Sequence, residues 1–236
     1  MAAKYKRILL KVSGEALAGE KGTGFDQETM SSICAGIKAA WEQKAQIGIV
    51  VGGGNFWRGR TSGEMDRTCA DKIGMLATVM NSLALADCLA QQGVPARVMT
   101  SVAMPQVGET FTAEGAIREL EQDRVVIFGG GTGCPFFSTD TASVLRALEI
   151  KADVMFKATM VDGVYDKDPK KYPDAVKYDT LTFSRVLEER LAVMDGTAAT
   201  LCRENGLPIL VFDLHQPENI AKALEDPSIG TLVIEE

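Results

Sequence analysis

Three clusters of small residues in this sequence each follow a short apolar run. They are Ser13-Gly14, Gly52-Gly53-Gly54 and Gly129-Gly130-Gly131. Glycine lets backbone amides approach a ligand closely and adopt positive φ angles, and amides in such turns bind phosphate groups. One cluster by itself is typical of a tight turn, but three clusters at the ends of apolar runs favour a phosphate-binding site.

Charged side chains accompany these clusters. Lys11 and Lys157 lie near the ends of apolar runs, Arg58 follows the second cluster and Asp140 follows the third. A lysine in a buried strand is costly unless an anion compensates it, and a lysine that reaches out to water is the alternative interpretation. The guanidinium group of Arg58 could bind two phosphate oxygens at once. Asp140 could also be an ordinary helix N-cap.

This combination of residues predicts phosphoryl transfer. Such chemistry requires positioning of the transferred group and stabilisation of its charge by cations, backbone amides and Mg²⁺. Thr132, Ser138 and Thr139 add hydroxyl donors just before Asp140. A phosphate or carboxylate acceptor is already ionised near neutral pH, so no general base is needed. The single histidine of the chain fits that requirement.

Other phosphate-binding and kinase motifs are missing from the sequence. The first predicted strand is not followed by the Gly-x-Gly-x-x-Gly pattern of dinucleotide-binding folds. Residues 54–61 resemble a P-loop, but Arg60 stands where that motif has lysine, and Ser62-Gly63 does not continue as a helix. The His-Arg-Asp and Asp-Phe-Gly landmarks of protein kinases are also absent.

The composition narrows the function classes further. The 236 residues carry 25 Lys and Arg against 32 Asp and Glu, a formal charge of −7, which argues against a nucleic-acid or membrane partner because both require a basic surface. With a single histidine in the chain, a Ser-His-Asp triad and a two-histidine zinc site are almost excluded. Five widely spaced cysteines, no signal peptide and no apolar run of about 20 residues predict a cytoplasmic protein with reduced thiols.

The elements that must position these residues follow from the apolar pattern. Continuous apolar runs that alternate with helical periodicity predict a three-layer α/β/α sandwich around a mainly parallel sheet, with residues 1–236 in a single domain. In such a sheet, ligands bind beyond the carboxyl ends of the strands. We expect strands at 8–12, 47–51, 96–100, 125–128, 154–157, 209–212 and 232–234, and a loop that carries Gly19, Gly22 and Gly24 after the first strand. We expect helices at 27–41, 68–92, 113–121 and 140–151, with Asp26 and Thr112 as the N-caps of the first and third.

Four ordered motifs resemble the amino-acid-kinase superfamily, and within it the bacterial uridylate (UMP) kinases. The resemblance covers essentially the whole chain, including residues 74–81 and 193–195. The motifs are Lys11-Val12-Ser13-Gly14-Glu15-Ala16-Leu17, Gly52-Gly53-Gly54-Asn55, Thr132-Gly133-x-Pro135-Phe136-Phe137-x-Thr139-Asp140 and Lys157-Ala158-Thr159-x-Val161-Asp162-Gly163-Val164-Tyr165.

This resemblance implies transfer of the γ-phosphoryl group of ATP to UMP, with Mg²⁺, in pyrimidine nucleotide biosynthesis. UMP would bind the N-terminal half and ATP the C-terminal half. Lys11, Arg58 and Lys157 would stabilise the migrating group, and Asp140 would orient these cations. The matching ATP-contacting positions are Lys11, Val12, Ser13, Gly14, Gly54, Arg58, Thr159, Tyr165 and Asp168, and the UMP-contacting positions are Gly53, Asp71, Thr132, Gly133, Cys134, Pro135, Phe136, Phe137, Ser138 and Thr139.

The resemblance also implies regulation and assembly. These enzymes are homohexamers that UTP inhibits, and their GTP activation involves a loop that corresponds to Gly19, Glu20, Lys21, Gly22, Thr23 and Gly24. The family usually has asparagine where Cys134 stands and threonine where Ser138 stands. Asp71 would accept hydrogen bonds from ribose hydroxyls, as an exposed carboxylate can, and a simple charge on a helix surface is the alternative.

Two other functions stay open at this stage. A kinase of the same superfamily that phosphorylates a carboxylate or carbamate is the first, and Asp71 and Pro135-Phe136-Phe137 argue against it. A non-catalytic nucleotide-binding protein is the second, and the presence of both Lys11 and Asp140 argues against that.

Overall fold

The computed structural model describes residues 4–57, 63–169, 171–189, 191 and 193–235. Its main feature is a nine-stranded sheet in the order β4-β3-β5-β2-β1-β6-β10-β11-β9. Neighbouring strands are parallel except β10 and β11, which pair antiparallel. The strands are β1 (Arg7–Val12), β2 (Gln46–Val51), β3 (Ala96–Thr100), β4 (Glu109–Thr110), β5 (Val125–Gly129), β6 (Val154–Thr159), β9 (Thr180–Thr182), β10 (Ile209–Asp213) and β11 (Thr231–Ile234), and β7 (Val164–Tyr165) pairs separately with β8 (Lys177–Tyr178).

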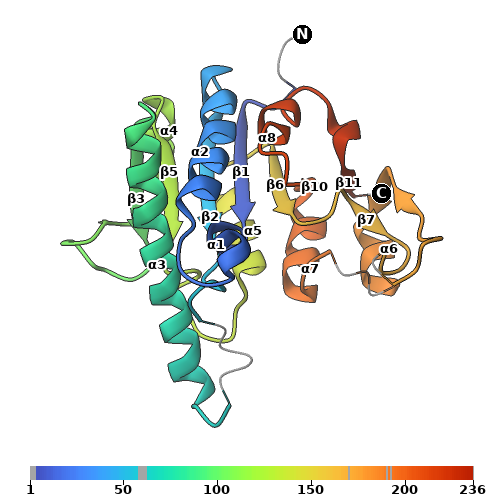
Figure 1. The fold of residues 1–236 in the computed structure, drawn as a ribbon, viewed down its shortest axis with the longest axis horizontal. Coiled ribbons are helices and arrows are strands. Elements are labelled where there is room, and N and C mark those ends of the chain that lie inside the picture. The colour runs from blue at the N-terminus through green and yellow to red at the C-terminus, as the bar shows by residue number, and fades with distance from the viewer. Residues whose placement is uncertain (1–3, 58–62, 170, 190, 192, 236) are drawn as a thin grey trace.

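Helices cover both faces of this sheet (Figure 1), as the sequence predicts. One face packs against α2, α3 and α8, and the other packs against α4, α5, α6 and α7. The helices are α1 (Gly14–Ala18), α2 (Gln27–Glu42), α3 (Arg67–Gln91), α4 (Ala113–Glu121), α5 (Thr139–Glu149), α6 (Phe183–Glu188), α7 (Gly196–Asn205) and α8 (Asn219–Lys222), with 3₁₀ turns at Gly19–Lys21 and Pro227–Ile229.

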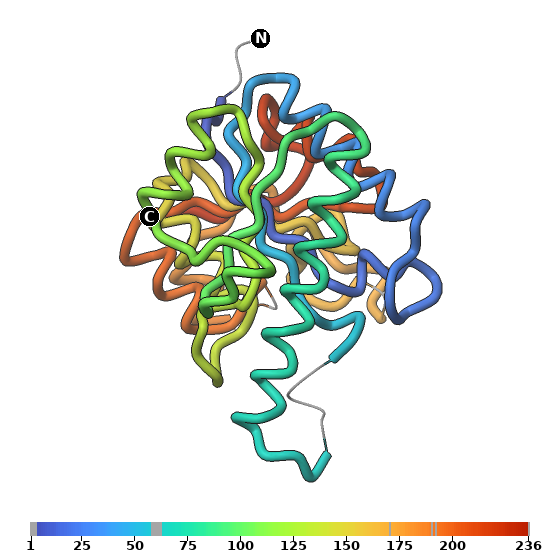
Figure 2. Tube along the Cα trace, turned by 90° about the vertical axis from the view of Figure 1, so that its left-hand side faces the viewer, coloured from blue at the N-terminus to red at the C-terminus, as the bar shows by residue number. Residues whose placement is uncertain are grey.

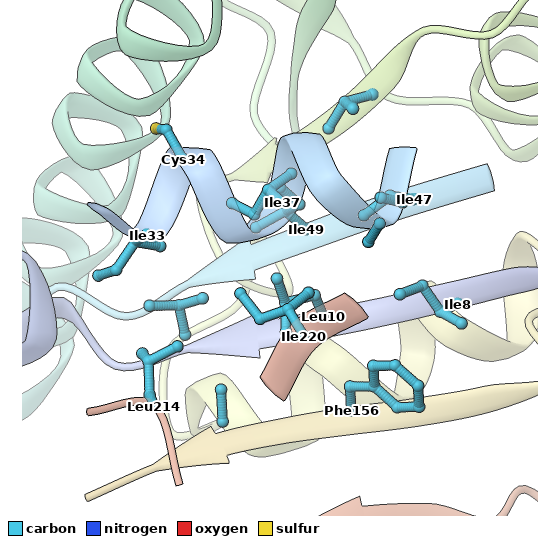
Figure 3. Packing of buried hydrophobic residues seen from close by; sticks show 14 of the residues in the cluster. Ile8, Leu10, Ile33, Cys34, Ile37, Ile47, Ile49, Phe156, Leu214 and Ile220 are labelled. Atoms are coloured by element: carbon cyan, nitrogen blue, oxygen red, sulfur yellow. The ribbon is translucent and has the colours of Figure 1, made fainter. Parts of the chain in front are cut away.

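The central strands are buried on both sides because each contributes alternate side chains to two apolar layers. Ile8 and Leu10 of β1 pack with Ile33 and Ile37 of α2 (Figure 3), whereas Leu9 of β1 faces the opposite layer. All of these side chains are at most 2% exposed, and burial of one such side chain contributes about 1.5–3 kcal/mol. This packing fixes the order of the strands, and that order determines which strand ends lie together at the site.

Helix α3 extends at its N-terminal end beyond the rest of the molecule (Figure 2). By length and composition it is apolar enough to cross a bilayer. It packs on β3 and β5, however, and it buries polar side chains of Thr78, Asn81 and Ser82. Such burial is typical of a core helix.

The predicted elements are confirmed at nearly every position, including the N-caps Asp26 of α2 and Thr112 of α4. Three features differ from the sequence interpretation. Residues 14–21, expected as a loop, form α1 and a 3₁₀ turn, because the Ser13 hydroxyl accepts a hydrogen bond from the Ala16 amide and starts a helix. Ser138 caps α5, so Asp140 lies within its first turn. The short strands β4 and β7–β9 were not expected.

Candidate functional site

A cavity of about 450 Å³ opens beyond the carboxyl ends of β1 and β2. The two glycine clusters there are in backbone contact, since a Cβ atom on Gly14 would lie 2.4 Å from the carbonyl oxygen of Gly52. The predicted residues that line this cavity are Lys11, Ser13, Gly14, Gly53, Gly54, Asp71, Thr132, Cys134, Phe137, Ser138 and Thr139.

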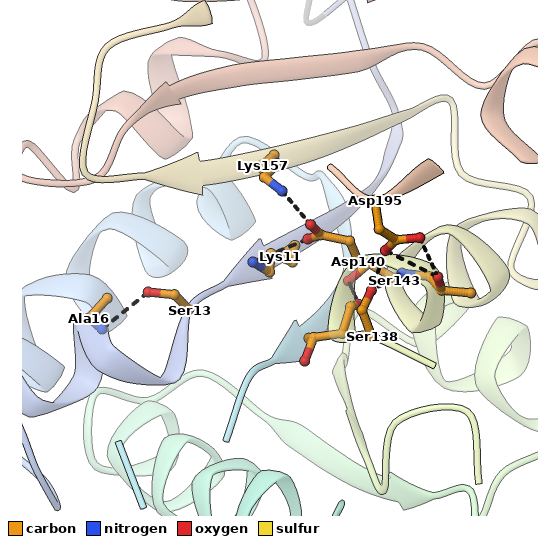
Figure 4. Close-up of polar contacts among 10 residues, drawn as sticks. Lys11, Ser13, Ala16, Ser138, Asp140, Ser143, Lys157 and Asp195 are labelled. Carbon is orange, nitrogen blue, oxygen red and sulfur yellow. Dashed lines mark hydrogen bonds and ion pairs between the residues drawn. The ribbon is translucent and has the colours of Figure 1, made fainter. Parts of the chain in front are cut away.

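Lys11, Asp140 and Lys157 form one network at this edge of the sheet (Figure 4). Lys11 of β1 and Lys157 of β6 are register neighbours. Asp140 comes from α5, and its Oδ1 lies 3.2 Å from Lys11 Nζ while its Oδ2 lies 2.6 Å from Lys157 Nζ. All three side chains are less than 18% exposed. The lysines therefore do not simply reach out to water, and the trio carries one net positive charge toward an anionic ligand.

The protonation of the network follows from burial and charge. Burial opposes ionisation of Asp140, but the adjacent charges of Lys11 and Lys157 outweigh burial and hold the pKa of this carboxyl below its ordinary value. Burial lowers the pKa of the Lys157 ammonium, and the attraction of Asp140 offsets this only in part because Lys11 repels the same charge. Two lysines that share one carboxylate are strong electrostatic donors for a phosphoryl group.

Asp195 is a site residue whose role sequence reasoning missed. It caps α7 by accepting a hydrogen bond from the Ala198 amide, and it also accepts hydrogen bonds from the Ser138 and Thr141 hydroxyls. It therefore joins the start of α7 to the first turn of α5, where Ser138 and Thr141 stand on either side of Asp140 in the sequence. The signal was available, because an aspartate directly before Gly196 at the start of a helical pattern is typical of an N-cap.

Asp71 is not the exposed carboxylate that the sequence interpretation assumed. Its side chain is only 13% exposed. Both of its oxygens lie 2.8 Å from Arg67 Nε and share that single N–H, and Oδ2 also accepts a hydrogen bond from the Phe136 amide. The contact with Phe136 ties α3 to the segment Thr132–Thr139. Phe136 itself, with a φ of 72°, is mainly exposed. Asp71 is thus held in a fixed orientation at the cavity wall.

A second cavity of about 470 Å³ lies on the β6 side of the network. The expected nucleotide-contacting residues Thr159, Tyr165 and Asp168 line it together with Lys157. The Tyr165 hydroxyl donates to Asp162 at 2.7 Å. Because Lys11 lines the first cavity and Lys157 the second, the network lies between two sites that could each hold a nucleotide.

The remaining predicted residues divide into four groups. Gly133 and Pro135 belong to the segment Thr132–Thr139 but are not among the residues that line the first cavity. Arg58 lies outside the described residues. The Val12 side chain is fully buried in the core, so it offers a ligand only its backbone. The segment Gly19–Gly24 lies beside the second glycine cluster, since the Gly24 amide donates to the Asn55 carbonyl oxygen at 3.1 Å. Next to this segment, hydrogen bonds from Thr29 and Lys21 lower the pKa of Asp26 to about 2.

A mainly parallel sheet that is covered on both faces defines an α/β protein. Glycine turns and a lysine–carboxylate–lysine network at the carboxyl edge of such a sheet are groups suited to binding phosphate. Comparison with family models gives the particular family. Residues 6–213 match the amino acid kinase family, and the chain belongs to it.

Three solved structures are similar to the chain over nearly its full length. A UMP kinase from Bacillus anthracis shares 37% identity at a TM-score of 0.95, over 98% of this chain and 97% of that one. A UMP kinase from Ureaplasma parvum shares 34% identity at a TM-score of 0.90, over 98% and 100%. A uridylate kinase from Archaeoglobus fulgidus shares 30% identity at a TM-score of 0.73, over 96% and 99%.

Proposed function

We propose that this protein is a UMP kinase that transfers the γ-phosphoryl group of ATP to UMP and releases ADP and UDP. The similar structures carry this activity in their names. The observation that supports it most directly is the network of Lys11, Asp140 and Lys157 between two cavities. A donor and an acceptor in these cavities would meet at the network.

UMP would occupy the first cavity, between Gly53, Asp71 and the segment Thr132–Thr139. Asp71 would accept hydrogen bonds from the ribose hydroxyls. The nucleoside of ATP would occupy the second cavity, beside Thr159, Tyr165 and Asp168. Its phosphates would extend past the lysine network to the amides of Lys11–Gly14 and Gly54 at the edge of the first cavity. The N-terminal half of one domain would thus hold the acceptor, and the C-terminal half would hold most of the donor.

The reaction would be a direct in-line transfer. The bond between the γ-phosphorus and the oxygen that bridges it to the β-phosphate breaks, and a bond forms to a phosphate oxygen of UMP. This oxygen is already ionised, so the protein abstracts no proton. Lys11 and Lys157 stabilise the charge on the migrating group, Asp140 holds both ammonium groups in place, and Arg58 would add a third cation.

The donor set fits a Mg²⁺ ion that arrives with ATP. Among the described residues, no group of three or more His, Cys, Asp or Glu side chains is arranged to hold a metal. Mg²⁺ often keeps several waters and binds mainly through substrate phosphates with one or two carboxylates. Asp140, which lies between the lysines of the two cavities, is the carboxylate that would hold such waters. When bound, the ion would neutralise charge on the phosphates.

The regulation and assembly of the enzyme are further parts of this proposal. We expect GTP to activate through Gly19–Gly24, UTP to inhibit, and the chain to form a homohexamer. Leu76, Met80 and Leu83 are 40–51% exposed along one face of α3, and an apolar stripe of this kind supports a subunit contact there. We place the reaction in the cytoplasm, in pyrimidine nucleotide biosynthesis, without nucleic-acid or membrane partners.

A phosphoryl-transfer assay tests the main proposal. Purified protein is incubated with Mg-ATP and UMP, CMP, dUMP, AMP, carbamate or aspartate, with and without GTP and UTP, and products are separated by anion-exchange chromatography. UDP from UMP is the expected main product, and Lys11→Ala is expected to abolish it. ATP binding without UDP formation would instead indicate a non-catalytic binding protein, and phosphorylation of carbamate or aspartate would indicate a different kinase of the family.

A further inference from the structure

One turn of helix α3 carries three buried polar side chains. Thr78 is 6% exposed, and Asn81 and Ser82 are fully buried. A buried polar group is costly unless it is hydrogen-bonded, so the partners of these groups indicate what the turn does. Two of the three side chains bond to glycine loops of the site, and the third bonds within the helix.

Asn81 is bonded to the second glycine cluster. Its Nδ2 donates to the Gly52 carbonyl oxygen at 2.6 Å and to Asn55 Oδ1 at 2.7 Å. Asn55, also buried, donates back from its own Nδ2 to Asn81 Oδ1 at 3.0 Å and to the Gly24 carbonyl oxygen at 2.8 Å. The two amide groups thus form a reciprocal pair that holds both ends of the turn Gly52–Asn55.

Thr78 is bonded to the third glycine cluster. Its hydroxyl accepts a hydrogen bond of 2.8 Å from the Gly130 amide and donates to the Met75 carbonyl oxygen at 2.7 Å. Gly130 has a φ of 85°, which places it in the region that favours glycine. The hydroxyl therefore fixes the point where the chain leaves β5 and enters the segment Thr132–Thr139.

We propose that Thr78 and Asn81 are positioning residues for phosphoryl transfer, because one rigid helical turn sets the distance between the two glycine loops that hold the substrates. The inference rests on the proposed roles of these loops. In-line transfer requires donor and acceptor phosphates to be aligned closely, and a displacement of about 1 Å can cost roughly 100-fold in rate. Neither side chain needs to touch the reacting atoms to have this effect.

Ser82 offers a matched control for simple stabilisation of the fold. It is fully buried on the same turn, and its hydroxyl donates to the Thr78 carbonyl oxygen within the helix at 2.8 Å. Ser82→Ala removes one buried hydrogen bond without removing a bond to either loop. If α3 only stabilises the fold, Thr78→Val, Asn81→Ala and Ser82→Ala should all lower stability and leave the kinetics of the folded enzyme unchanged.

The test is steady-state kinetics per folded enzyme, with the folded fraction taken from urea denaturation. Asn81→Ala is expected to lower kcat/KM about 10- to 100-fold, and the double variant with Asn55→Ala should be no worse than the poorer single variant because the two amides act as one unit. Thr78→Val, which keeps the side-chain shape, should raise the KM for UMP more than the KM for ATP. Asn81→Ser serves as a milder variant if Asn81→Ala does not fold.

The kinetics of folded Thr78→Val and of folded Asn81→Ala, or Asn81→Ser in its place, are compared with those of Ser82→Ala. The inference is overturned if kcat and both KM values agree within about twofold. It is also overturned if the Asn55 and Asn81 effects are simply additive. Lys11→Ala distinguishes this failure from failure of the proposed function. An inactive Lys11→Ala enzyme beside normal Asn81 and Thr78 variants would refute only the positioning role, whereas an active Lys11→Ala enzyme would refute the proposed chemistry.

Discussion

Replacement of Asp140 by asparagine removes the negative charge that Lys11 and Lys157 share. The substitution keeps the side-chain shape, so it tests charge and not packing. The oxygens of this carboxylate lie 3.2 Å from Lys11 Nζ and 2.6 Å from Lys157 Nζ, and all three side chains are less than 18% exposed. Without the negative charge, the two ammonium groups face each other in a largely buried pocket. They would repel each other and separate.

The size of the effect follows from burial. Removal of one partner of a buried ion pair costs about 3–5 kcal/mol, and the lower end applies because the network borders an open cavity. A loss of about 3 kcal/mol lowers the melting temperature of a chain of this length by roughly 6–12 °C. Because the pKa of Asp140 is lowered in the folded state, this contribution is present above the ordinary carboxyl pKa and disappears as the pH falls through the lowered value.

In activity, displacement of both lysines should reduce kcat at least 100-fold, which corresponds to about 2.7 kcal/mol of transition-state stabilisation. The KM for ATP should change less, because backbone amides supply much of the phosphate contact. UDP formation at pH 7.5 measures the effect on activity, and thermal unfolding followed from pH 7.5 down to pH 2 measures the effect on stability and its loss in acid. Asp226→Asn, the same substitution at an exposed cap of a 3₁₀ turn, is the control. A kcat within threefold of the unsubstituted enzyme would refute this reasoning.

Three further predictions concern other parts of the molecule. Since burial lowers the pKa of Lys157, kcat should fall as the pH rises toward the ordinary pKa of lysine. Lys157→Arg stays charged and should move this fall in kcat to higher pH. The same pH profile of kcat in both enzymes would contradict the prediction. Cys134 is exposed and lines the first cavity, so UMP should slow its alkylation by iodoacetamide at least tenfold, as measured by peptide mass spectrometry. The exposed thiol of Cys69 is the control and should react at the same rate with and without UMP. Equal protection of both thiols would be evidence against the proposed UMP site. Met80→Glu puts a charge into the proposed subunit contact on α3 and should reduce the particle mass measured by analytical ultracentrifugation. Val176→Glu, at another exposed apolar position, should leave the mass unchanged. An equal mass for both variants would place the subunit contact elsewhere.

Most of the fold could be predicted because its signals are local. The apolar runs of β1, β2 and β5 and the N-caps Asp26 and Thr112 are visible in the chain itself. Helix α1 was missed because five residues are too few to show a helical period. The two-residue strands β7 and β8 were missed because they exist only through pairing with each other.

The candidate site was predictable in its residue types and less so in its geometry. From the sequence alone, Asp71 is expected to be an exposed carboxylate, but its burial depends on Arg67 and on the Phe136 amide, which lies 65 positions further along the chain. Asp195 was visible as a helix cap, but its bond to Ser138 spans 57 positions. Partners this far apart in sequence leave no periodic trace.

The sequence by itself determined that glycine turns follow apolar strands and that lysines stand at two strand ends, because strand periodicity and positive φ are properties of a few adjacent residues. Only the tertiary structure decided that Lys11 and Lys157 become register neighbours across β1 and β6 and meet Asp140 of α5. Strand order and register arise from burial of both faces of the sheet at once. The spacing of the two glycine loops, set through Thr78 and Asn81, is likewise a property of the whole packed fold.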